Sequence, residues 1–503
     1  MITRDQSLPV GPGEKREFWL VLFALTALYI FFVAIGNRRY VWYDELFTFD
    51  IARSPSLKQL WSRELRFDNH TPTIYLLSRY SMAIFGSTPL GLRFPSMVEF
   101  YFGSIAILVY VRRKANIAFA TLAVLLLWAV APTLFYAVEA RPYALEFLSF
   151  SCLLLSWDTA IRIEQRRLAL FGIAASTLAL TLAHMFAVFT IFPFFVAEAV
   201  RFLHRRKPDH RLWAAMLVPM LSMLIYVPLI RASENIVFGI HPSFHTIIFF
   251  FEDTLGSPIL SVVLLTLLVI PAPPNVRTTA IRFRSEEIAL LACMFLSPIL
   301  LNLLLIYRQG TFYNRYCLAS QVAILVGLTI LLPYRMRINR WAASAGSILL
   351  LLFILDKQIF HVLRFPVPGN AAFLGSIHPD LPLVAAEGQV FAEMNHYENA
   401  ALLSRLYFLR DPQAALQLAH TNFFQVFEAP DDMKRAGFPY AGNIAPYSDF
   451  VRQHRQFLLL SSPGKWVFAK LLSSGASMAL VGDYKGAMPY VDTTLYLVTM
   501  PSQ

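Results

Sequence analysis

A short acidic run, Trp42-Tyr43-Asp44-Glu45, follows the first long apolar segment of the chain. A second polar run, Asp68-Asn69-His70-Thr71-Pro72, comes soon after it. Carboxylates are costly where a chain meets a bilayer, so the adjacent Asp44 and Glu45 indicate a chemical function. The alternative is that both residues only cap a helix, because acidic side chains stabilise a helix N-terminus.

Further polar side chains lie in other gaps between apolar segments. An arginine can bind a phosphate through two parallel hydrogen bonds. A cavity that combines Asp44 with several cations would therefore suit an anion with a long apolar tail, such as a lipid-linked phosphosugar. The candidates are Glu139, Arg141, Tyr143, His184, His241, His245, Glu252, Asp253, Arg315 and Tyr316.

Two of these candidates, and His70 of the second polar run, also have structural explanations. Arg141 could be an interfacial arginine paired with Glu139. His70 could cap the helix that follows it, and His184 could be a hydrogen-bonded turn residue. The sequence leaves these alternatives open.

The chain offers no clean metal-ligand spacing. The sequence leaves open whether Glu45, His241 or His245 binds a divalent cation, and no other cofactor is expected. The three cysteines fall in or at the ends of apolar segments, so neither a disulfide nor a zinc-cysteine site is expected.

The composition is that of a polytopic membrane protein. Of its 503 residues, 57% are hydrophobic and 15% are charged, whereas soluble domains carry about 25% charged residues. The mean hydropathy is +0.53. A spanning helix needs about 17–25 mostly apolar residues, and about eleven segments meet this requirement. They lie near residues 18–36, 93–111, 117–131, 133–157, 168–183, 186–203, 212–231, 256–272, 287–306, 317–333 and 341–358.

The basic residues indicate orientation rather than a nucleic-acid partner. The formal net charge is +11, but the basic clusters occupy every second loop, as the positive-inside rule requires of cytoplasmic loops. We therefore expect the N-terminus in the cytoplasm, and the loops with Asp44, Arg141, His184 and Arg315 outside. The clusters include Arg112-Arg113-Lys114, Arg166-Arg167 and Arg205-Arg206-Lys207.

Two apolar segments differ from ordinary spanning helices or could be mistaken for other signals. Residues 72–86 are short and carry Arg79, so we expect an interfacial or re-entrant helix on the outer face. The first apolar segment lacks an A-x-A-like cleavage site, which indicates a retained anchor.

The composition becomes polar from about residue 360, where prolines, a glycine and an asparagine over residues 366–370 predict a linker. We expect a transmembrane module over residues 1–358 and a small α/β domain, outside the membrane, over residues 359–503. The patterns in this domain predict a helix over 398–409 and strands over 381–386, 456–460, 479–481 and 495–500.

The order of the polar motifs resembles that of a known family. Over residues 18–335 it is similar to bacterial relatives of the dolichyl-phosphate-mannose-protein mannosyltransferases. These are membrane glycosyltransferases of the GT-C superfamily, which also includes the enzyme that adds aminoarabinose to lipid A. The motifs are Trp42-Tyr43-Asp44-Glu45, Asp68-x-His70-x-Pro72-x-x-Tyr75, Phe85-Gly86, Leu92-Arg93-Phe94-Pro95-Ser96, Glu139-Ala140-Arg141-Pro142-Tyr143-Ala144-Leu145 and Asn314-Arg315-Tyr316.

The resemblance implies an α-helical GT-C fold in the bacterial inner membrane. It also implies an inverting transfer of a sugar from a polyprenyl-phosphate donor to an acceptor on the outer face. Asp44 matches the family's loop carboxylate, which is expected to be the general base, and Glu45 accompanies it in the catalytic motif. A carboxylate suits this task, because inversion needs a base that deprotonates the acceptor hydroxyl.

The resemblance also implies a binding site for the donor. His70 matches a position expected near the lipid phosphate, whereas Arg141 and Arg315 match the family's recurrent Arg-x-Tyr and Arg-Tyr positions. We expect all three to bind the phosphate, because its growing charge needs cations. The relatives carry His-Pro-Pro where this chain has His70-Thr71-Pro72. The remaining candidates for substrate contact are Asp68, Tyr143, His184 and Tyr316.

Two other functions compete with this interpretation. A flippase or transporter of a lipid-linked saccharide would also need an outward cavity with cations. Many transporters show paired inverted repeats and broken helices, and neither is visible in this sequence. A scaffold with an external binding domain would not need Asp44. The sequence identifies neither the sugar nor the acceptor, which could be a protein, a lipid or a glycan.

Overall fold

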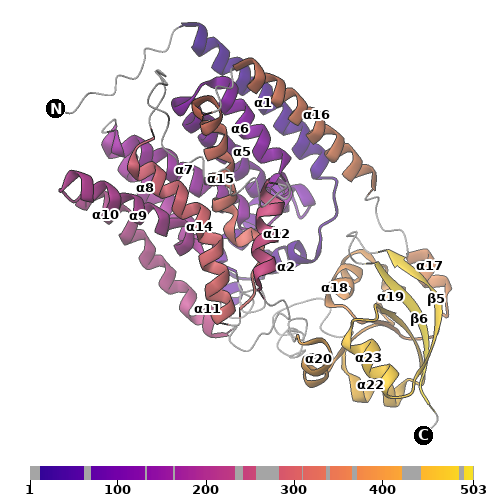
Figure 1. The fold of residues 1–503 in the computed structure, drawn as a ribbon. Helices are drawn as coiled ribbons and strands as arrows, with labels where there is room; N and C mark the ends of the chain where they lie inside the picture. Colours follow the sequence, from indigo (N-terminus) through magenta and orange to yellow (C-terminus); the bar gives the residue numbers. More distant parts are fainter. Residues whose placement is uncertain are drawn as a thin grey trace. The chain divides into compact units, whose positions relative to one another are not determined.

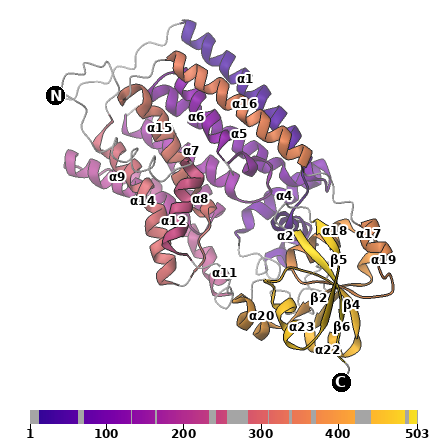
Figure 2. The same cartoon turned by 45° about the vertical axis from the view of Figure 1, so that its right-hand side comes forward.

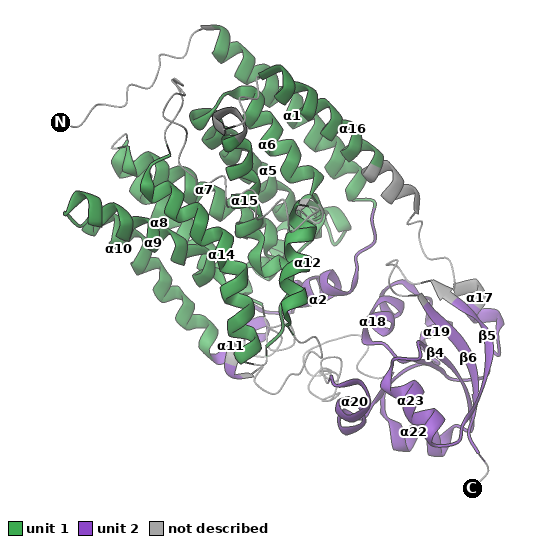
Figure 3. Ribbon diagram, in the orientation of Figure 1, with its two compact units in different colours: residues 1–38, 70–227, 241–360 green, residues 39–69, 228–240, 361–503 purple. Residues whose placement is uncertain are grey.

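The computed structural model of the chain describes residues 12–61, 70–130, 133–162, 165–232, 242–255, 283–308, 310–335, 340–364, 371–421, 443–485 and 492–501. The chain forms two compact units, each assembled from separate stretches of sequence (Figure 3). The first unit comprises residues 1–38, 70–227 and 241–360. The second comprises residues 39–69, 228–240 and 361–503. The division at residue 358 that composition suggested stays a prediction.

The first unit is a helix bundle (Figure 1). Helix α7 packs beside α5 and α8, and α14 packs beside α9 and α15. The helical elements that begin in this unit are α1 (Pro12–Gly36), α4 (Pro72–Phe85), α5 (Pro89–Lys114), α6 (Ile117–Ala129), η3 (Thr133–Val138), α7 (Tyr143–Ile161), α8 (Arg166–Ala183), α9 (Ala187–Arg205), α10 (His210–Met220), η4 (Leu221–Tyr226), α11 (Val227–Ala232), α12 (Phe244–Leu255), α14 (Ser285–Tyr307), η5 (Asn314–Cys317), α15 (Leu318–Arg335) and α16 (Arg340–Arg364).

Within the described residues, seven helices are long and apolar enough to cross a bilayer. The protein is therefore a multi-pass membrane protein, as its composition predicted. The total of eleven spans stays a prediction, and the predicted span over 256–272 lies outside the described residues. The seven are Gly13–Gly36, Pro89–Lys114, Tyr143–Ile161, Arg166–Ala183, Ala187–Arg205, Ser285–Tyr307 and Asn314–Leu331.

One predicted span is wrong in its extent. Residues 133–157 do not form one helix, because η3 ends at Val138 and α7 begins only at Tyr143. The residue before a proline is disfavoured in helical conformation, so Pro142 explains why Arg141 lies in a turn. The break gives Glu139 and Arg141 an irregular segment between two helical elements.

The helix predicted over residues 72–86 is confirmed as α4. Its 14 residues extend about 21 Å at 1.5 Å per residue, which is shorter than the roughly 30 Å hydrocarbon core. Gly86 follows it with φ +80, a left-handed conformation that ends the helix and favours glycine. Its interfacial location stays a prediction.

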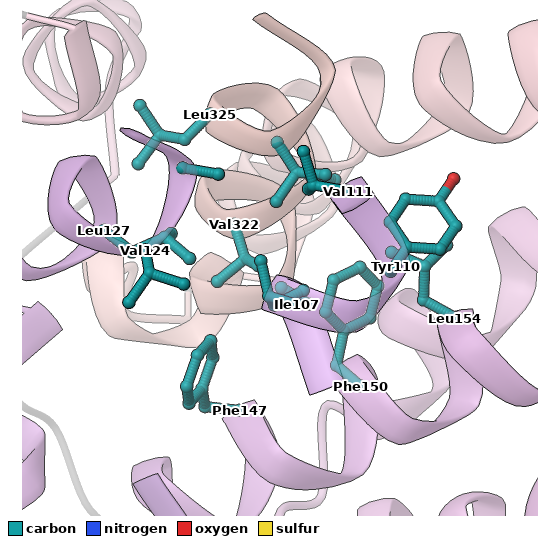
Figure 4. Close-up of a cluster of buried hydrophobic side chains, with 14 of the residues drawn as sticks. Ile107, Tyr110, Val111, Val124, Leu127, Phe147, Phe150, Leu154, Val322 and Leu325 are labelled. Carbon is teal, nitrogen blue, oxygen red and sulfur yellow. The ribbon is translucent and has the colours of Figure 1, made fainter. Parts of the chain in front are cut away.

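The core of the first unit lies between α5, α6, α7 and α15 (Figure 4). Ile107, Val124 and Val322 are fully or almost fully buried there. The ring of Phe147 lies 4.7 Å from that of Phe100. A Cβ at Gly103 would lie 2.7 Å from this Phe147 ring. Glycine is therefore required for α5 and α7 to approach so closely.

Buried ion pairs join the helices at one end of this bundle. Lys114 Nζ, at the end of α5, lies 2.7 Å from Asp158 Oδ1 in the last turn of α7. The same ammonium contacts Glu287 in the first turn of α14, and Arg162 Nε lies 3.2 Å from Asp158. The Lys114, Asp158 and Glu287 side chains are at most 4% exposed. This group therefore satisfies buried charges by pairing.

A second group of paired charges lies at the same helix ends. Arg201 Nη2, in α9, lies 2.6 Å from Glu198 Oε2 and 2.8 Å from Asp209 Oδ2. Arg166 Nη2, at the start of α8, donates to Asp209 Oδ1 over 2.6 Å. Burial alone would raise the pKa of Asp209, but hydrogen bonds from Arg166 and Arg201 lower it to about 2. We call these two groups together the paired end.

The second unit contains a six-stranded mixed sheet with the strand order β3-β2-β1-β4-β6-β5 (Figure 2). Strands β3, β2, β1 and β4 are parallel, and β6 is antiparallel to both β4 and β5. The strands are β1 (Leu383–Ala385), β2 (Leu406–Arg410), β3 (Ile444–Pro446), β4 (Gln456–Ser461), β5 (Ser477–Lys485) and β6 (Asp492–Thr499).

The predicted small α/β domain is confirmed, with one error in its elements. Residues 398–409 do not form a helix, because only the short α19 (Ala400–Leu403) is helical and β2 follows it. Leu406 pairs with Leu383 of β1, and Phe408 pairs with Ile444 of β3. The other helices of this unit are α2 (Tyr43–Ala52), α3 (Leu57–Gln59), α17 (Ala371–Ser376), α18 (Gly388–Tyr397), α20 (Pro412–Ala419), α22 (Tyr447–Gln453) and α23 (Trp466–Ser473).

Helix α18 of this domain packs against α2 of the early polar loop. The Tyr397 hydroxyl accepts a hydrogen bond from Val41 N at 2.9 Å and donates one to Val41 O at 3.0 Å. The Tyr397 ring also lies edge-on to Tyr40, with 5.1 Å between centroids. Tyr397 therefore fixes the backbone three residues before Asp44.

Candidate functional site

Two threonines bring His70 to the end of α8. Thr71 Oγ1 donates to the carbonyl of Ala183 at 3.1 Å, and Thr73 Oγ1 donates to that of Leu182 at 2.8 Å. These carbonyls belong to the last turn of α8, where they lack helical partners. The start of α4 is thereby held against the end of α8, and the His70 and His184 rings lie 6.0 Å apart.

His184 is a buried histidine held in one orientation. Its Nδ1 accepts a hydrogen bond from Phe186 N at 3.2 Å, so the neutral ring carries its proton on Nε2. Burial lowers the pKa of His184 well below its usual value, and the charges of His70, Arg315 and Arg141 lower it further. His184 is therefore a neutral donor at physiological pH.

Arg141 and Tyr143 occupy the break before α7. Arg141 N donates to the carbonyl of Glu139 at 2.8 Å, which closes a tight turn. Both Arg141 and Glu139 are buried. Tyr143, the first residue of α7, is completely buried, and its hydroxyl has no hydrogen-bond partner among the described residues. That hydroxyl can donate to a ligand.

Arg315 and Tyr316 reach the same place from η5. The Arg315 guanidinium carbon lies 5.6 Å from the ring centroid of Tyr143 and 4.6 Å from that of Tyr313. The Tyr316 ring lies 5.4 Å from the His184 ring. Aromatic faces attract a guanidinium electrostatically, so the tyrosines hold Arg315 beside His184.

The structure thus brings together six of the residues that the sequence singled out. We call this group the site end, because its members lie at the helix ends opposite the paired end. Tyr143 starts α7 and Asp158 lies in its last turn, about 22 Å away along the helix axis. The members are His70, Arg141, Tyr143, His184, Arg315 and Tyr316.

Two aromatic residues that pack against the site end have no counterpart among the residues that the sequence singled out. The Tyr136 ring lies 4.8 Å from that of Tyr143, and the Phe186 ring lies 4.7 Å from that of Tyr316. Tyr136 was assigned to a continuous span, which hid its position in η3. No sequence signal distinguishes Phe186 from the other aromatic residues of the apolar segments.

The early acidic pair belongs to the second unit, where its two residues differ. Glu45 is fully buried at the third position of α2. Its Oε2 accepts from Trp42 N at 3.4 Å and from Arg39 Nη2 at 3.3 Å. The helix-capping interpretation thus fits Glu45. Asp44, half-buried in the first turn of α2, stays the candidate base.

Other candidate residues do not extend the site. Asp68 and His241 lie outside the described residues, and His245 is exposed on α12. Asp253 of α12 accepts a hydrogen bond from Asn314 Nδ2 at 3.2 Å, which ties α12 to η5. No group of three or more His, Cys, Asp or Glu side chains that could hold a metal ion occurs in the part of the chain that the structure describes.

Comparisons with known proteins establish the fold. No protein-family model and no curated protein matches the sequence. Two crystal structures of ArnT from Cupriavidus metallidurans are similar, one in the apo state and one bound to undecaprenyl phosphate. Each gives a TM-score of 0.52, at 14% and 15% identity, and they cover 96% and 95% of this chain and 98% of the ArnT chain. The chain therefore has the GT-C fold of ArnT, as the motif order predicted.

Proposed function

We propose that this protein transfers a sugar from a polyprenyl-phosphate donor to an acceptor at the outer face of the bacterial inner membrane. The observation that carries the proposal is the site end, where two arginines and two histidines converge at buried helix ends. A fold shared with ArnT, one structure of which is bound to undecaprenyl phosphate, supports the same class of donor.

The site end has the hydrogen-bond donors that a lipid phosphate needs. Arg141 and Arg315 supply planar guanidinium groups that match phosphate oxygens, and Tyr143 supplies a buried hydroxyl. Burial is the main cause of the lowered pKa of His184, and His70, Arg315 and Arg141 lie close enough to lower it further. The attraction between these cations and a bound anion is stronger there than in water, because burial lowers the effective dielectric constant.

In the proposed reaction, Asp44 acts on the acceptor and the site end acts on the lipid-linked donor. Asp44 takes the proton of an acceptor hydroxyl, and the hydroxyl oxygen forms a bond to C1 of the sugar from the face opposite the phosphate. The bond between C1 and the phosphate oxygen breaks, and the phosphodiester becomes a phosphomonoester with additional negative charge. His70, Arg141 and Arg315 stabilise that charge, and the configuration at C1 is inverted.

The test is turnover by the full-length protein in proteoliposomes, with a panel of undecaprenyl-phosphate sugars. We expect one donor to be consumed and mass analysis to find its sugar on a lipid, protein or glycan. Movement of donor between leaflets without any new glycosidic bond would contradict the proposal and favour a transporter.

Asp44→Asn keeps the shape of the side chain but removes its basicity. Turnover should fall by roughly 10²–10⁴, the usual effect of losing a general base, while donor binding remains. The matched control is Asp449→Asn, a half-buried aspartate of α22, which should leave turnover unchanged. Near-normal turnover of Asp44→Asn would remove Asp44 from the mechanism.

The proposed orientation has its own test. Ser473 is exposed on α23, so Ser473→Cys in a background without the three native cysteines reports the side of the C-terminal domain. We expect an impermeant maleimide to label it from the extracytoplasmic side of intact spheroplasts. Labelling only after the membrane is opened would contradict this orientation.

A further inference from the structure

A cavity of about 320 Å³ lies between α2 and α18 in the second unit. Helix α2 and its C-terminal cap contribute Leu46, Phe49, Asp50 and Arg53. This spacing of three, four and seven residues places the four side chains on one helix face. Helix α18 contributes Ala392, Asn395 and His396 from the other side.

The cavity has an apolar floor and a polar rim. Leu46, Phe49 and Ala392 are buried, whereas Arg53 and His396 are exposed. Both exposed side chains rest on Phe49, with the guanidinium carbon 4.9 Å and the imidazole centroid 5.3 Å from the ring centroid. These contacts hold the rim in place before a ligand arrives, which reduces the entropy cost of binding.

The rim of the cavity combines side chains of both charges with neutral hydrogen-bond donors and acceptors. Asp50 carries the charge opposite to that of Arg53. Partial burial against the protein lowers the pKa of the otherwise exposed His396, and the nearby Arg53 lowers it further, so the imidazole is neutral at pH 7. Asn395 Nδ2 donates to the Phe391 carbonyl at 2.8 Å. The amide oxygen of Asn395 can accept a hydrogen bond from a ligand. A rim with acceptors, donors and no net charge suits vicinal hydroxyl groups, each of which donates and accepts.

We propose that this cavity binds a neutral saccharide and is the acceptor subsite of the transferase. Its volume is at the small end of the range for small-molecule sites, about 300–1,000 Å³, which suits a mono- or disaccharide. A phosphate or other anion fits less well, because Asp50 would repel it. The term acceptor rests on the proposed function, whereas the binding of a saccharide does not.

The position of the cavity on α2 limits what can serve as the acceptor. Asp44 and Asp50 lie on the same helix, about 9 Å apart along its axis at 1.5 Å per residue, but Asp44 lies on the helix face opposite to the four lining residues. A saccharide held by Asp50, Arg53 and Asn395 therefore reaches the proposed base only through a further sugar unit that extends around the N-terminal turn of α2. Because α18 supplies the other wall, the C-terminal domain takes part in choosing the acceptor.

Saturation-transfer difference NMR on the full-length protein in nanodiscs tests the binding directly. The probes are the methyl glycosides of glucose, galactose and mannose, together with maltose. We expect at least one to give a signal that falls about fivefold or more in Asn395→Ala and in Arg53→Ala, and that excess inorganic phosphate does not displace. Arg452→Ala is the matched control, because Arg452 is exposed on α22 and pairs with Asp449. Its signal should equal that of wild type.

Three results would overturn the saccharide site: no probe gives a signal, both variants bind as wild type does, or phosphate displaces the sugar. Should Arg53→Ala fail to fold, Asn395→Ala decides, since its melting temperature shows whether the protein is intact. Failure of the proposed function looks different, because binding then persists while no lipid-linked donor is consumed. Sugar transfer without any binding at this cavity would overturn the subsite alone.

Discussion

The two ends of the helix bundle bring different ionisable groups together. At the paired end, Lys114 lies between Asp158 and Glu287, and Asp209 receives two arginines. At the site end, Arg315 rests on tyrosine rings and lies beside the buried His184. Helix α7 and the two ends of α8 contribute to both.

The difference shows in how each end treats ionisation. The pKa of Asp209 falls to about 2, because neighbouring cations stabilise its charged form. The pKa of His184 also falls, but this means that burial and nearby cations disfavour its charged form. The paired end joins its charges in ion pairs that stabilise the fold, whereas the site end gathers arginines and histidines around buried tyrosines, where we propose that an anion binds.

The largest expected effect is on stability at the paired end. Lys114→Met removes the cation shared by two buried carboxylates, and breaking a buried pair costs about 3–5 kcal/mol. We expect a large loss of thermal stability in detergent and no specific change in donor affinity. Arg452→Met, in an exposed pair on α22, should cost at most about 1 kcal/mol. Equal losses of stability in the two variants would contradict a structural role for the paired end.

A smaller effect separates ligand binding from stability at the site end. Tyr143→Phe removes only the hydroxyl that has no partner among the described residues. Stability of the free protein should stay the same or rise slightly. Affinity for undecaprenyl phosphate should fall about 2- to 10-fold, the loss of one hydrogen bond worth about 0.5–1.5 kcal/mol. Thermal unfolding with and without the lipid measures both quantities.

The smallest effect is a pH dependence from His184. Its folded pKa lies below the unfolded value of 6.5, so the unfolded chain binds the extra proton as the pH falls. Its contribution to stability is therefore present above pH 6.5 and is lost below it, by at most about 1.4 kcal/mol per pH unit. His184→Gln should flatten the melting temperature between pH 6.5 and 5.5. An unchanged slope would assign the dependence to other groups, among them His70 and His396.

Long apolar patterns predicted most of the helices, although they hid the break between η3 and α7 within residues 133–157. The break at His184 between two apolar segments became the turn between α8 and α9. Short patterns were less reliable: residues 398–409 suited a helix, but Leu406 and Phe408 pair with strands distant in the sequence. Such non-local pairing overrides local preference.

Two features of the candidate site had no local signal at all. The hydrogen bonds between Tyr397 and Val41 join residues 356 positions apart, and nothing in either segment indicates its partner. The separate behaviour of Asp44 and Glu45 also depends on tertiary structure, because it is Arg39 that pairs with Glu45. Motif order could name the pair but could not divide its roles.

Thermal unfolding with increasing undecaprenyl phosphate tests the account most directly, by placing the same Arg-to-Lys change at each end. A ligand that binds only the folded protein stabilises it by about 2.7 kcal/mol at 100 times its Kd. Arg166→Lys, at the paired end, should lower the starting stability but gain as much from the lipid as wild type does. Arg141→Lys, which keeps the charge but loses the planar fork, should gain clearly less at every lipid concentration. Equal gains for wild type and Arg141→Lys would contradict the assignment of the site end as the phosphate site.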